Sequence, residues 1–263
     1  MNYVRYTEAP ARRAELLRRL SADGYVSSAS VAEEFGVSEM TIRRDLRQLH
    51  HEGHARRVAG GASLPVGGAR GLPFEERDHR ASRQKAAIAA ACARELEGSA
   101  TVALDAGTTV AGVASLLSPG ITVVTHSVPV IATCTERDDL SLIGLGGTYL
   151  RDTRSFTGQS VRDGLSRISP DVAVLSATAV DATGVLCAND LDAEIKQAMA
   201  AGARRTILLV DSAKIGARAP MRFASLGSID LVITGDDLDS EQREILADAP
   251  DVLCVGGPAE AAR

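Results

Sequence analysis

The chain has 263 residues, of which 45% are hydrophobic and 24% are charged, and its formal net charge is −5. This length allows one large domain or two smaller ones, and the hydrophobic content can fill an ordinary core. The absence of Trp and an aromatic content of only 3% argue against an aromatic platform on which nucleic-acid bases would stack.

The charge is distributed unevenly along the chain. Residues 1–60 contain ten Arg, no Lys and eight acidic residues, which gives this part a net charge of +2 and leaves −7 for the rest. A mildly basic head on an acidic body suits a module that reads DNA attached to a domain with a different task.

Cysteine spacing and hydropathy indicate the cellular compartment. The four cysteines are far apart and form no C-x-x-C pair, which favours reduced thiols over disulfides or a zinc site. The N-terminus has early charges, and no run of 18 apolar residues occurs. The five histidines show no metal-ligand spacing. We therefore expect a soluble, cytoplasmic protein with no membrane partner, no metal and no cofactor.

Two short helices are predicted at the start of the chain. Residues 11–23 carry leucines at helical spacing and are followed by Gly24, a typical glycine after a helix end. After a short extended segment, Ser27-Ser28 offers caps for a second helix, which runs to Phe35 and closes at Gly36.

Residues 38–49 predict a third helix with one apolar and one polar face. Ile42, Leu46 and Leu49 fall within about one third of the circumference, the width of an apolar stripe. Ser38 can accept a hydrogen bond from a first-turn N–H, so the helix is expected to begin there. The remaining surface carries Met40, Thr41, Arg43, Arg44 and Arg47. Because this surface suits an anionic partner, we interpret the segment as a DNA-recognition helix.

A small hairpin, or wing, is predicted after the third helix, with Arg56 and Arg57 near its tip or stem. Short helices, a glycine-containing turn and an arginine-bearing helix form the helix-turn-helix pattern. The alternative is a structural three-helix bundle whose arginines are a solvated face, which is the usual role of such runs. The order of these features within about 50 residues favours DNA binding.

Residues 11–62 resemble the winged helix-turn-helix of the DeoR family of bacterial transcription regulators. The stretch Phe35-Gly-Val-Ser-Glu-Met-Thr-Ile-Arg-Arg-Asp-Leu46 matches that family's signature almost throughout. The resemblance implies that the third helix enters the major groove. The DNA contacts that it implies are Ser38, Thr41, Arg43 and Arg44. The wing departs from the family, which usually has His-Gly-Gly where this chain has Ala59-Gly60-Gly61.

A stretch rich in glycine and proline separates the head from the body. It contains Pro65, Gly67-Gly68, Gly71 and Pro73, and it is expected to be flexible at its start. We predict a DNA-binding domain over residues 8–63, a linker over 64–82 and a sensor domain over 83–257. Such a linker lets two heads adjust to two half-sites.

From residue 83 onward helices and strands alternate, which favours a mostly parallel sheet covered by helices. An amphipathic helix is predicted over residues 85–96, and the apolar run at 100–104 is typical of a strand buried on both faces. Strands are predicted at 100–104, 121–125, 140–145, 172–176, 206–210, 231–234 and 252–255.

Polar and glycine residues follow several of these strands, at the sheet edge where open α/β proteins bind ligands. The sharpest case is Asp105-Ala-Gly-Thr-Thr109, where free N–H groups and threonine hydroxyls suit a phosphate or carboxylate. The alternative is that Thr108 or Thr109 simply caps its helix. Several such loops on one edge, together with Lys214, favour a ligand site.

A second resemblance is carried by Asp105-Ala-Gly-Thr-Thr109, Thr125-His-Ser127, Gly146-Gly147, Gly158, Asp181, Glu194-Ile-Lys196 and Asp211-Ser-Ala-Lys214. Through these pieces, residues 83–235 resemble the effector-sensing domain of the same family, which is similar in fold to ribose-5-phosphate isomerase and the CoA transferases. The resemblance implies a pocket for a phosphorylated sugar or a related metabolite. The predicted site residues are Asp105, Gly107, Thr108, Thr109, Thr125, His126, Ser127, Gly146, Gly147, Asp181, Glu194 and Lys214. This chain has His126 where the family usually has Asn, and Ser176-Ala-Thr-Ala179 where the family has Gly-Ala-x-Gly.

Two alternatives to a ligand-responsive regulator stay open. Asp181, Glu194 and Lys214 are the residue types that sugar-phosphate isomerisation needs, so the body could be an isomerase-like enzyme with an accessory DNA-binding head. No Walker loop and no G-x-S-x-G elbow occurs. In the second alternative, the body only oligomerises the DNA-binding heads.

The favoured interpretation is a DNA-binding transcriptional regulator that is not an enzyme, and the resemblance implies a repressor. Its expected partners are double-stranded operator DNA, a phosphorylated sugar or similar effector, and further copies of itself in a dimer or tetramer. Each head reads a short half-site, so tight binding needs at least two heads.

Overall fold

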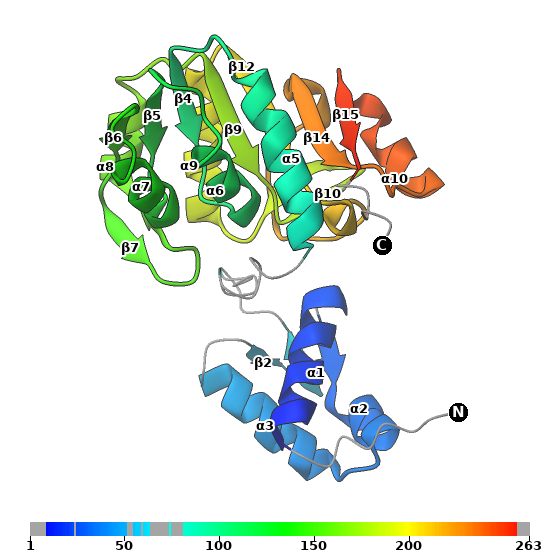
Figure 1. The fold of residues 1–263 in the computed structure, drawn as a ribbon. Helices are drawn as coiled ribbons and strands as arrows, with labels where there is room; N and C mark the ends of the chain where they lie inside the picture. The colour runs from blue at the N-terminus through cyan, green and yellow to red at the C-terminus, as the bar shows by residue number, and fades with distance from the viewer. Residues whose placement is uncertain are drawn as a thin grey trace, which may run out of the picture. The chain divides into compact units, whose positions relative to one another are not determined.

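The computed structural model describes residues 9–23, 25–51, 55–58, 60–63, 74 and 81–256. The chain divides into two compact units, residues 1–71 and 72–263 (Figure 1). Most of the predicted linker, residues 64–82, lies outside the described residues, so its boundaries and those of the two domains stay a prediction.

Three helices are described in the first unit. The predicted caps of the second and third are confirmed, whereas Gly24, predicted to follow the first, lies outside the described residues. They are α1 (Ala9–Asp23), α2 (Ser28–Phe35) and α3 (Glu39–His51). The Ser27 hydroxyl accepts from Ser30 N–H at the start of α2, and Gly36 ends that helix in the left-handed region, with φ of 65°. Ser38 Oγ accepts from Thr41 N–H at 3.1 Å, which confirms the predicted start of α3.

The predicted wing is confirmed as an antiparallel hairpin. It consists of β2 (Arg56–Val58) and β3 (Gly61–Ser63), and β3 also pairs with β1 (Tyr25–Ser27). Gly61 has no room for a side chain, because a Cβ there would lie 1.9 Å from the carbonyl oxygen of Val26. The close approach of β1 and β3 thus requires glycine at this position.

A seven-stranded parallel sheet is the centre of the second unit. Its strand order is β15-β14-β12-β9-β4-β5-β6. Every predicted strand is confirmed to within one residue at each end. The strands are β4 (Thr101–Leu104), β5 (Thr122–Thr125), β6 (Ser141–Gly144), β9 (Val172–Ser176), β12 (Arg205–Leu209), β14 (Leu231–Gly235) and β15 (Val252–Val255).

Helices cover both faces of this sheet, which is why its central strands are apolar throughout (Figure 1). On one face, Val102 and Leu104 pack in a core with Ile88 of α5. On the other, Ala103 belongs to a second core that includes Met199 of α9. The helices are α5 (Ser82–Glu95), α6 (Thr108–Ala114), α7 (Val128–Thr135), α8 (Gln159–Leu165), α9 (Asp190–Gly202) and α10 (Ser240–Ile245), with 3-10 turns at Ser212–Lys214, Leu226–Ser228 and Leu246–Asp248.

Five short antiparallel strands were not predicted from the sequence. A separate sheet has the order β10-β11-β13, and β7 pairs with β8 as a hairpin. The strands of the large sheet were predicted from their alternation with helices, which these five strands lack, so their pairing depends on the surrounding structure. They are β7 (Thr148–Leu150), β8 (Ser155–Thr157), β10 (Ala179–Asp181), β11 (Gly184–Cys187) and β13 (Met221–Ala224).

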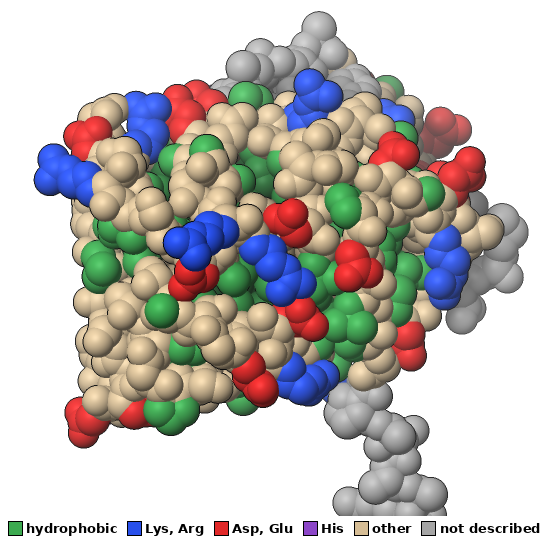
Figure 2. All heavy atoms as spheres, turned by 90° about the horizontal axis from the view of Figure 1, so that it is seen from above, with side chains coloured by type: hydrophobic (Ala, Val, Ile, Leu, Met, Phe, Trp, Pro, Cys, Tyr) green, Lys and Arg blue, Asp and Glu red, His purple; other side chains and the backbone are tan. Residues whose placement is uncertain are grey.

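The end of the sheet at which the parallel strands begin carries side chains of both charges. Arg205 lies 2.9 Å from the carboxylate of Glu95, and Arg204 lies 3.5 Å from that of Asp171. Figure 2 looks onto the upper side of Figure 1, where the α5–β4 connection lies, and shows basic and acidic side chains interspersed there. No single sign of charge dominates this view. Among the described helices, none has both the length and the hydropathy that crossing a membrane requires.

Candidate functional site

The two faces of α3 are those that the apolar spacing predicted. Ile42, Leu46 and Leu49 are buried in the core of the first unit. Met40, by contrast, is 68% exposed, and Arg44 and Arg47 are exposed with it. Because residues at i, i+4 and i+7 share one side of a helix, these three side chains form one surface.

The arginines of α3 differ in whether their charge is already neutralised. Arg43 contacts Glu39 one turn earlier, with its Nε at 3.0 Å and its terminal nitrogen at 2.8 Å from Oε1. The same oxygen accepts a hydrogen bond from Ser28 Oγ at 2.8 Å. Arg44 and Arg47 make no ion pair with another described residue, so their charge stays available to an anionic partner.

A buried ion pair joins α3 to α1, and sequence reasoning missed it. Arg12 and Asp45 are 5% and 3% exposed, and Arg12 Nε donates to the Asp45 carboxylate. Arg13 lies 3.7 Å from the same carboxylate. A signal was present, because Asp45 borders the apolar stripe of Ile42, Leu46 and Leu49. An acidic residue on a buried stripe needs a cation to compensate it.

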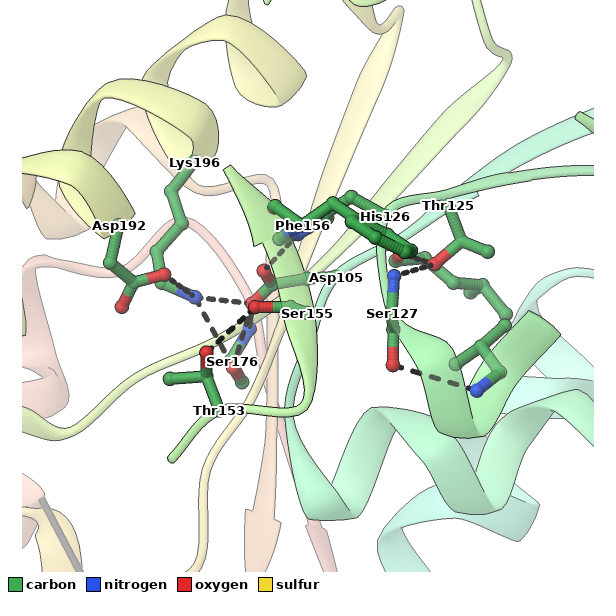
Figure 3. Close-up of polar contacts among 12 residues, drawn as sticks. Asp105, Thr125, His126, Ser127, Thr153, Ser155, Phe156, Ser176, Asp192 and Lys196 are labelled. Atoms are coloured by element: carbon green, nitrogen blue, oxygen red, sulfur yellow. Dashed lines mark hydrogen bonds and ion pairs between the residues drawn. The ribbon is translucent and has the colours of Figure 1, made fainter. Parts of the chain in front are cut away.

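In the second unit, Asp105 is the centre of a buried polar cluster at the end of β4 (Figure 3). Its side chain is fully buried. One carboxylate oxygen accepts from the backbone N–H of Ser176 at 2.9 Å and from its hydroxyl at 2.7 Å. The same oxygen forms an ion pair with Lys196, and the other lies 3.4 Å from His126 Nε2. Asp105 thus joins β4, β9, α9 and the loop after β5.

Lys196 extends this cluster through α9. Its ammonium group lies 3.4 Å from the carboxylate of Asp192, one turn earlier, and 3.3 Å from Ser176 Oγ. Burial by itself would raise the pKa of Asp105, but Lys196 and His126 together hold it well below its ordinary value. Burial would lower the pKa of Lys196, but Asp105 and Asp192 raise it instead. Asp105 and Lys196 are therefore both charged at neutral pH.

Lys196, Asp192 and Ser176 were absent from the predicted site residues. Lys196 shares one side of α9 with Ala193 and Met199, and all three are buried. This spacing was visible in the sequence, because a lysine on the apolar stripe of a helix needs a carboxylate within reach. Which carboxylate it reaches was not visible, since Asp105 lies 91 residues earlier.

The loop after β5 uses its polar side chains within the fold. Thr125 Oγ1 donates to the carbonyl of Leu104 at 2.7 Å and accepts from Ser127 N–H at 3.1 Å. The Ser127 hydroxyl caps α7. His126 Nδ1 is 2.8 Å from the carbonyl oxygen of Phe156, so this ring connects β8 to Asp105. Both ring nitrogens of His126 therefore have a contact within the fold.

Gly107 and its neighbours form the turn from β4 into α6. A Cβ at Gly107 would lie 2.5 Å from the Cβ and Oγ of Ser176, so glycine is required there. Gly107 is itself the N-cap of α6, without a side-chain cap bond, and Thr108 and Thr109 are buried in the first turn. The alternative that one of these threonines caps the helix is wrong.

The glycine pair after β6 approaches β8 closely. A Cβ at Gly147 would lie 2.4 Å from the carbonyl oxygen of Thr157. The carbonyl of Gly146 accepts from Ser160 Oγ at 3.0 Å. The two glycines thus allow the loop after β6 to lie against β8 and the start of α8.

The remaining predicted site residues make other contacts. Asp181 accepts from the N–H and the hydroxyl of Thr183, at 2.8 and 2.6 Å. Glu194 is exposed and lies 2.8 Å from Arg162. Lys214 donates to the carbonyl of Ala177 at 3.0 Å, next to Ser176. Within the described part of the chain, the contacts of Asp181 and Glu194 do not reach the Asp105 cluster. Nor do the described residues hold a group of three or more His, Cys, Asp or Glu arranged for a metal ion.

Two family models match the chain. The model of the DeoR-like helix-turn-helix domain matches residues 12–66, and that of the DeoR C terminal sensor domain matches residues 80–236. The chain belongs to the DeoR family. This DeoR-family protein is therefore a transcriptional regulator in which a DNA-binding helix-turn-helix domain precedes an α/β sensor domain. The predicted family, fold class and regulator function are confirmed, and the isomerase-like alternative is not favoured.

Individual relatives agree with this assignment over nearly the whole chain. The HTH-type transcriptional regulator GlpR of Haloferax volcanii is 33% identical over 244 residues, which are 91% of this chain and 95% of the relative. The glycerol-3-phosphate regulon repressor of Escherichia coli is 28% identical, and the match covers 89% of this chain and 93% of the relative.

Among solved structures, a D-ribose-5-phosphate isomerase in complex with phospho-erythronic acid is similar over 49% of this chain and 52% of its own, at 20% identity and a TM-score of 0.35.

Proposed function

We propose that this DeoR-family regulator is a repressor that binds operator DNA as a dimer or tetramer and responds to a phosphorylated sugar or a related metabolite. The observation that carries the proposal is the exposed surface of α3, where Arg44 and Arg47 have no described ion pair. The name of the Escherichia coli relative, a repressor of a glycerol-3-phosphate regulon, supports both repression of transcription and a phosphorylated effector. The domain boundaries proposed for it are residues 8–63, 64–82 and 83–257.

The proposed DNA contacts divide into two kinds. The Ser38 and Thr41 hydroxyls, 2.8 Å apart at the start of α3, suit phosphate oxygens and fix the register of the helix. Arg44 suits bidentate recognition of guanine, and Met40 beside it offers an apolar contact to a thymine methyl group. The remaining proposed contacts are Arg43, Arg47, Arg56 and Arg57, the last two in the wing strand.

Replacing Arg44 with alanine is expected to relax sequence preference, because a bidentate guanine contact contributes about 1–3 kcal/mol of discrimination. Replacing Arg57 is expected to weaken all sequences alike and to reduce the salt dependence of binding. Titration of operator and random DNA at several salt concentrations measures both effects. Arg18→Ala is the control, since this exposed arginine of α1 is paired with Glu15. Equal loss of specific and non-specific binding in Arg44→Ala would contradict the base contact.

The proposed effector site lies at the carboxyl ends of three adjacent strands, β4, β5 and β6. Open parallel sheets bind ligands at this edge. Its proposed residues after these strands are Asp105, Gly107, Thr108, Thr109, Thr125, His126, Ser127, Gly146 and Gly147. We add Lys196 and Asp192 because they contact Asp105 directly or through one side chain. Asp181, Glu194 and Lys214 complete the proposed set with weaker support from the geometry.

A thermal-shift screen of phosphorylated sugars and glycerol 3-phosphate is expected to reveal compounds that raise the melting temperature. A ligand present at one hundred times its Kd stabilises the native state by about 2.7 kcal/mol. Each hit should then change operator affinity, since an effector acts only if it binds the two states of the regulator differently. Glu97→Gln, at an exposed position after α5 and outside the proposed site, is expected to leave the binding of these compounds unchanged.

Two outcomes of this screen would overturn the proposal in different ways. If no phosphorylated compound changes stability or operator affinity and Lys214→Ala is also silent, a body that only oligomerises the heads is the better interpretation. Turnover of pentose phosphates without sequence-preferring DNA binding would instead favour the enzyme alternative.

A further inference from the structure

Phe74 is the one residue between positions 64 and 80 that the structure describes, and it packs into the second unit. Its side chain is only 5% exposed. Its backbone N–H donates to the carbonyl of Asp152 at 3.1 Å, and the guanidinium of Arg154 lies 5.6 Å from the centre of its ring. A cation over an aromatic face is attracted to the ring electrons. The segment that follows the first unit is therefore held at Phe74 by the turn between β7 and β8.

That turn is bonded to the loop that carries His126. The carbonyl of Arg154 accepts from Val128 N–H at 2.9 Å, and Phe156 N–H donates to the carbonyl of His126 at 2.9 Å. Between them, Ser155 forms a β-bridge with Ser127. Arg154 itself has φ of 49°, one of two non-glycine residues in the left-handed region among those described. These contacts define the direction in which the Arg154 side chain leaves the turn.

The same loop ends at the buried cluster of the sensor. His126 Nδ1 lies 2.8 Å from the carbonyl oxygen of Phe156, and its Nε2 lies 3.4 Å from Asp105 (Figure 3). If Nδ1 donates to Phe156, Nε2 donates to Asp105 only when the ring carries both protons. A continuous set of contacts thus runs from the Asp105 carboxylate through His126 and the β7–β8 turn to the ring of Phe74.

We propose that Phe74 and Arg154 are positioning residues that couple the Asp105–His126 site to the segment joining the two units. We call the set of contacts from Asp105 through His126 and Arg154 to Phe74 the relay. This inference rests on the proposed function, in which a ligand at that site controls DNA binding. A ligand that rearranges His126 would shift its backbone partners in β8, and with them the guanidinium that covers Phe74. Release or retention of Phe74 then decides whether the chain that precedes the sensor stays attached at Asp152 and Arg154. Neither residue touches the ligand in this scheme.

Cleavage by glutamyl endopeptidase tests the anchor without any effector. This protease cuts after Glu75 and Glu76, which directly follow Phe74 in the sequence. In the full-length protein, Phe74→Ala and Arg154→Ala are expected to speed cleavage there about ten-fold, since the adjacent Phe74 must leave its contacts before the protease can bind the chain. The matched control is Arg151→Ala, because Arg151 lies in the same turn and is exposed. Equal acceleration by both arginine variants would contradict a specific Arg154 contact.

A double-mutant cycle tests the coupling. His126→Asn is expected to change the cleavage rate in the wild-type background and to have no further effect in Phe74→Ala. Independent, multiplying effects of the two substitutions would overturn the relay. If His126→Asn does not fold, amide exchange in the other variants replaces it. Arg154→Ala should then accelerate exchange of the Phe74 and Phe156 amides together, and Arg151→Ala should accelerate neither. Unchanged exchange at Phe156 in Arg154→Ala would also overturn the relay.

The relay and the proposed function fail in distinguishable ways, because the cleavage assay contains no ligand. If His126→Asn has no further effect in Phe74→Ala and no phosphorylated compound changes stability or operator affinity, the relay is supported and the effector class is rejected. Conversely, suppose that His126→Asn and Phe74→Ala change the cleavage rate independently, while a phosphorylated compound changes operator affinity. These two results together would reject the relay and leave the proposed function standing. A final measurement then compares operator affinity of Phe74→Ala with and without that compound. The relay predicts that the change in affinity is largely lost, while Arg151→Ala keeps it.

Discussion

Replacing Lys196 with methionine is expected to destabilise the second unit by about 3–5 kcal/mol, the usual cost of removing one partner from a buried ion pair. Asp105 is fully buried and would lose the cation that offsets its desolvation. The two hydrogen bonds from Ser176 would remain, but they do not neutralise the charge. Chemical denaturation of the full-length variant, followed by circular dichroism, measures the loss.

The pH dependence gives this prediction a sign. In the wild type the pKa of Asp105 is depressed, so its contribution to stability is present above its ordinary pKa and is lost as pH falls below about 4. Without Lys196, burial is expected to raise the pKa of Asp105. The variant therefore loses most stability at neutral and higher pH, where this carboxyl is charged in the unfolded chain. The difference in stability between the two proteins should therefore shrink as the pH is lowered from 8 towards 4.

Two further variants separate charge from packing at this site. Asp105→Asn combined with Lys196→Met removes both charges and is expected to recover much of the lost stability, since a neutral replacement of a buried pair is often tolerated. Lys214→Met is the comparison, because that lysine is 22% exposed and its carboxylate neighbour is 3.6 Å away. If Lys196→Met costs no more than Lys214→Met, Lys196 does not compensate Asp105.

Replacing Asp45 with alanine is expected to cost the first unit a similar amount, about 3–5 kcal/mol, because the buried Arg12 would lose the carboxylate that it contacts in α3. Arg12 is 5% exposed, and its ion pair with Asp45 joins α1 to α3. Because α3 also carries the proposed DNA contacts, operator binding should fall with the stability of the unit. Thermal unfolding and DNA titration on the same preparations measure the two losses together.

The control for Asp45→Ala is Glu34→Ala in the same unit. Glu34 forms an ion pair with Arg19, but its side chain is 57% exposed. An exposed pair of this kind contributes at most about 1 kcal/mol, so the control should keep nearly full stability. The double substitution Arg12→Met with Asp45→Leu should be more stable than Asp45→Ala. A double variant as unstable as the single one would show that packing, not the unpaired charge, accounts for the loss.

Local patterns were sufficient for the elements that bury apolar residues at a regular period. The spacing of Ile42, Leu46 and Leu49 predicted both faces of α3, and Ser38 predicted where it begins. The apolar runs of the central strands predicted the parallel sheet, because strands covered on both faces are apolar throughout. The glycine and polar residues after those strands indicated the sheet edge at which Asp105 lies.

The partners of individual buried charges depended on the tertiary structure. Lys196 lies 91 residues from Asp105, and Ser176 lies 71 residues from it. They meet because β4 and β9 are neighbours in the sheet and α9 packs over them, an arrangement that no local pattern specifies. His126 was likewise placed by the pairing of β8 with the loop after β5, and strands of three residues have no period to predict them.

The sequence by itself thus determined the class of protein, the recognition helix and the edge of the sheet where a ligand site is expected. It did so because helical and strand periods, caps and turn residues are properties of short segments. Only the tertiary structure decided that Asp105 is compensated by Lys196, that Asp45 is compensated by Arg12, and that Phe74 is held by Arg154. Each of these contacts joins segments that are distant in sequence, and which segments meet is set by the packing of the whole unit.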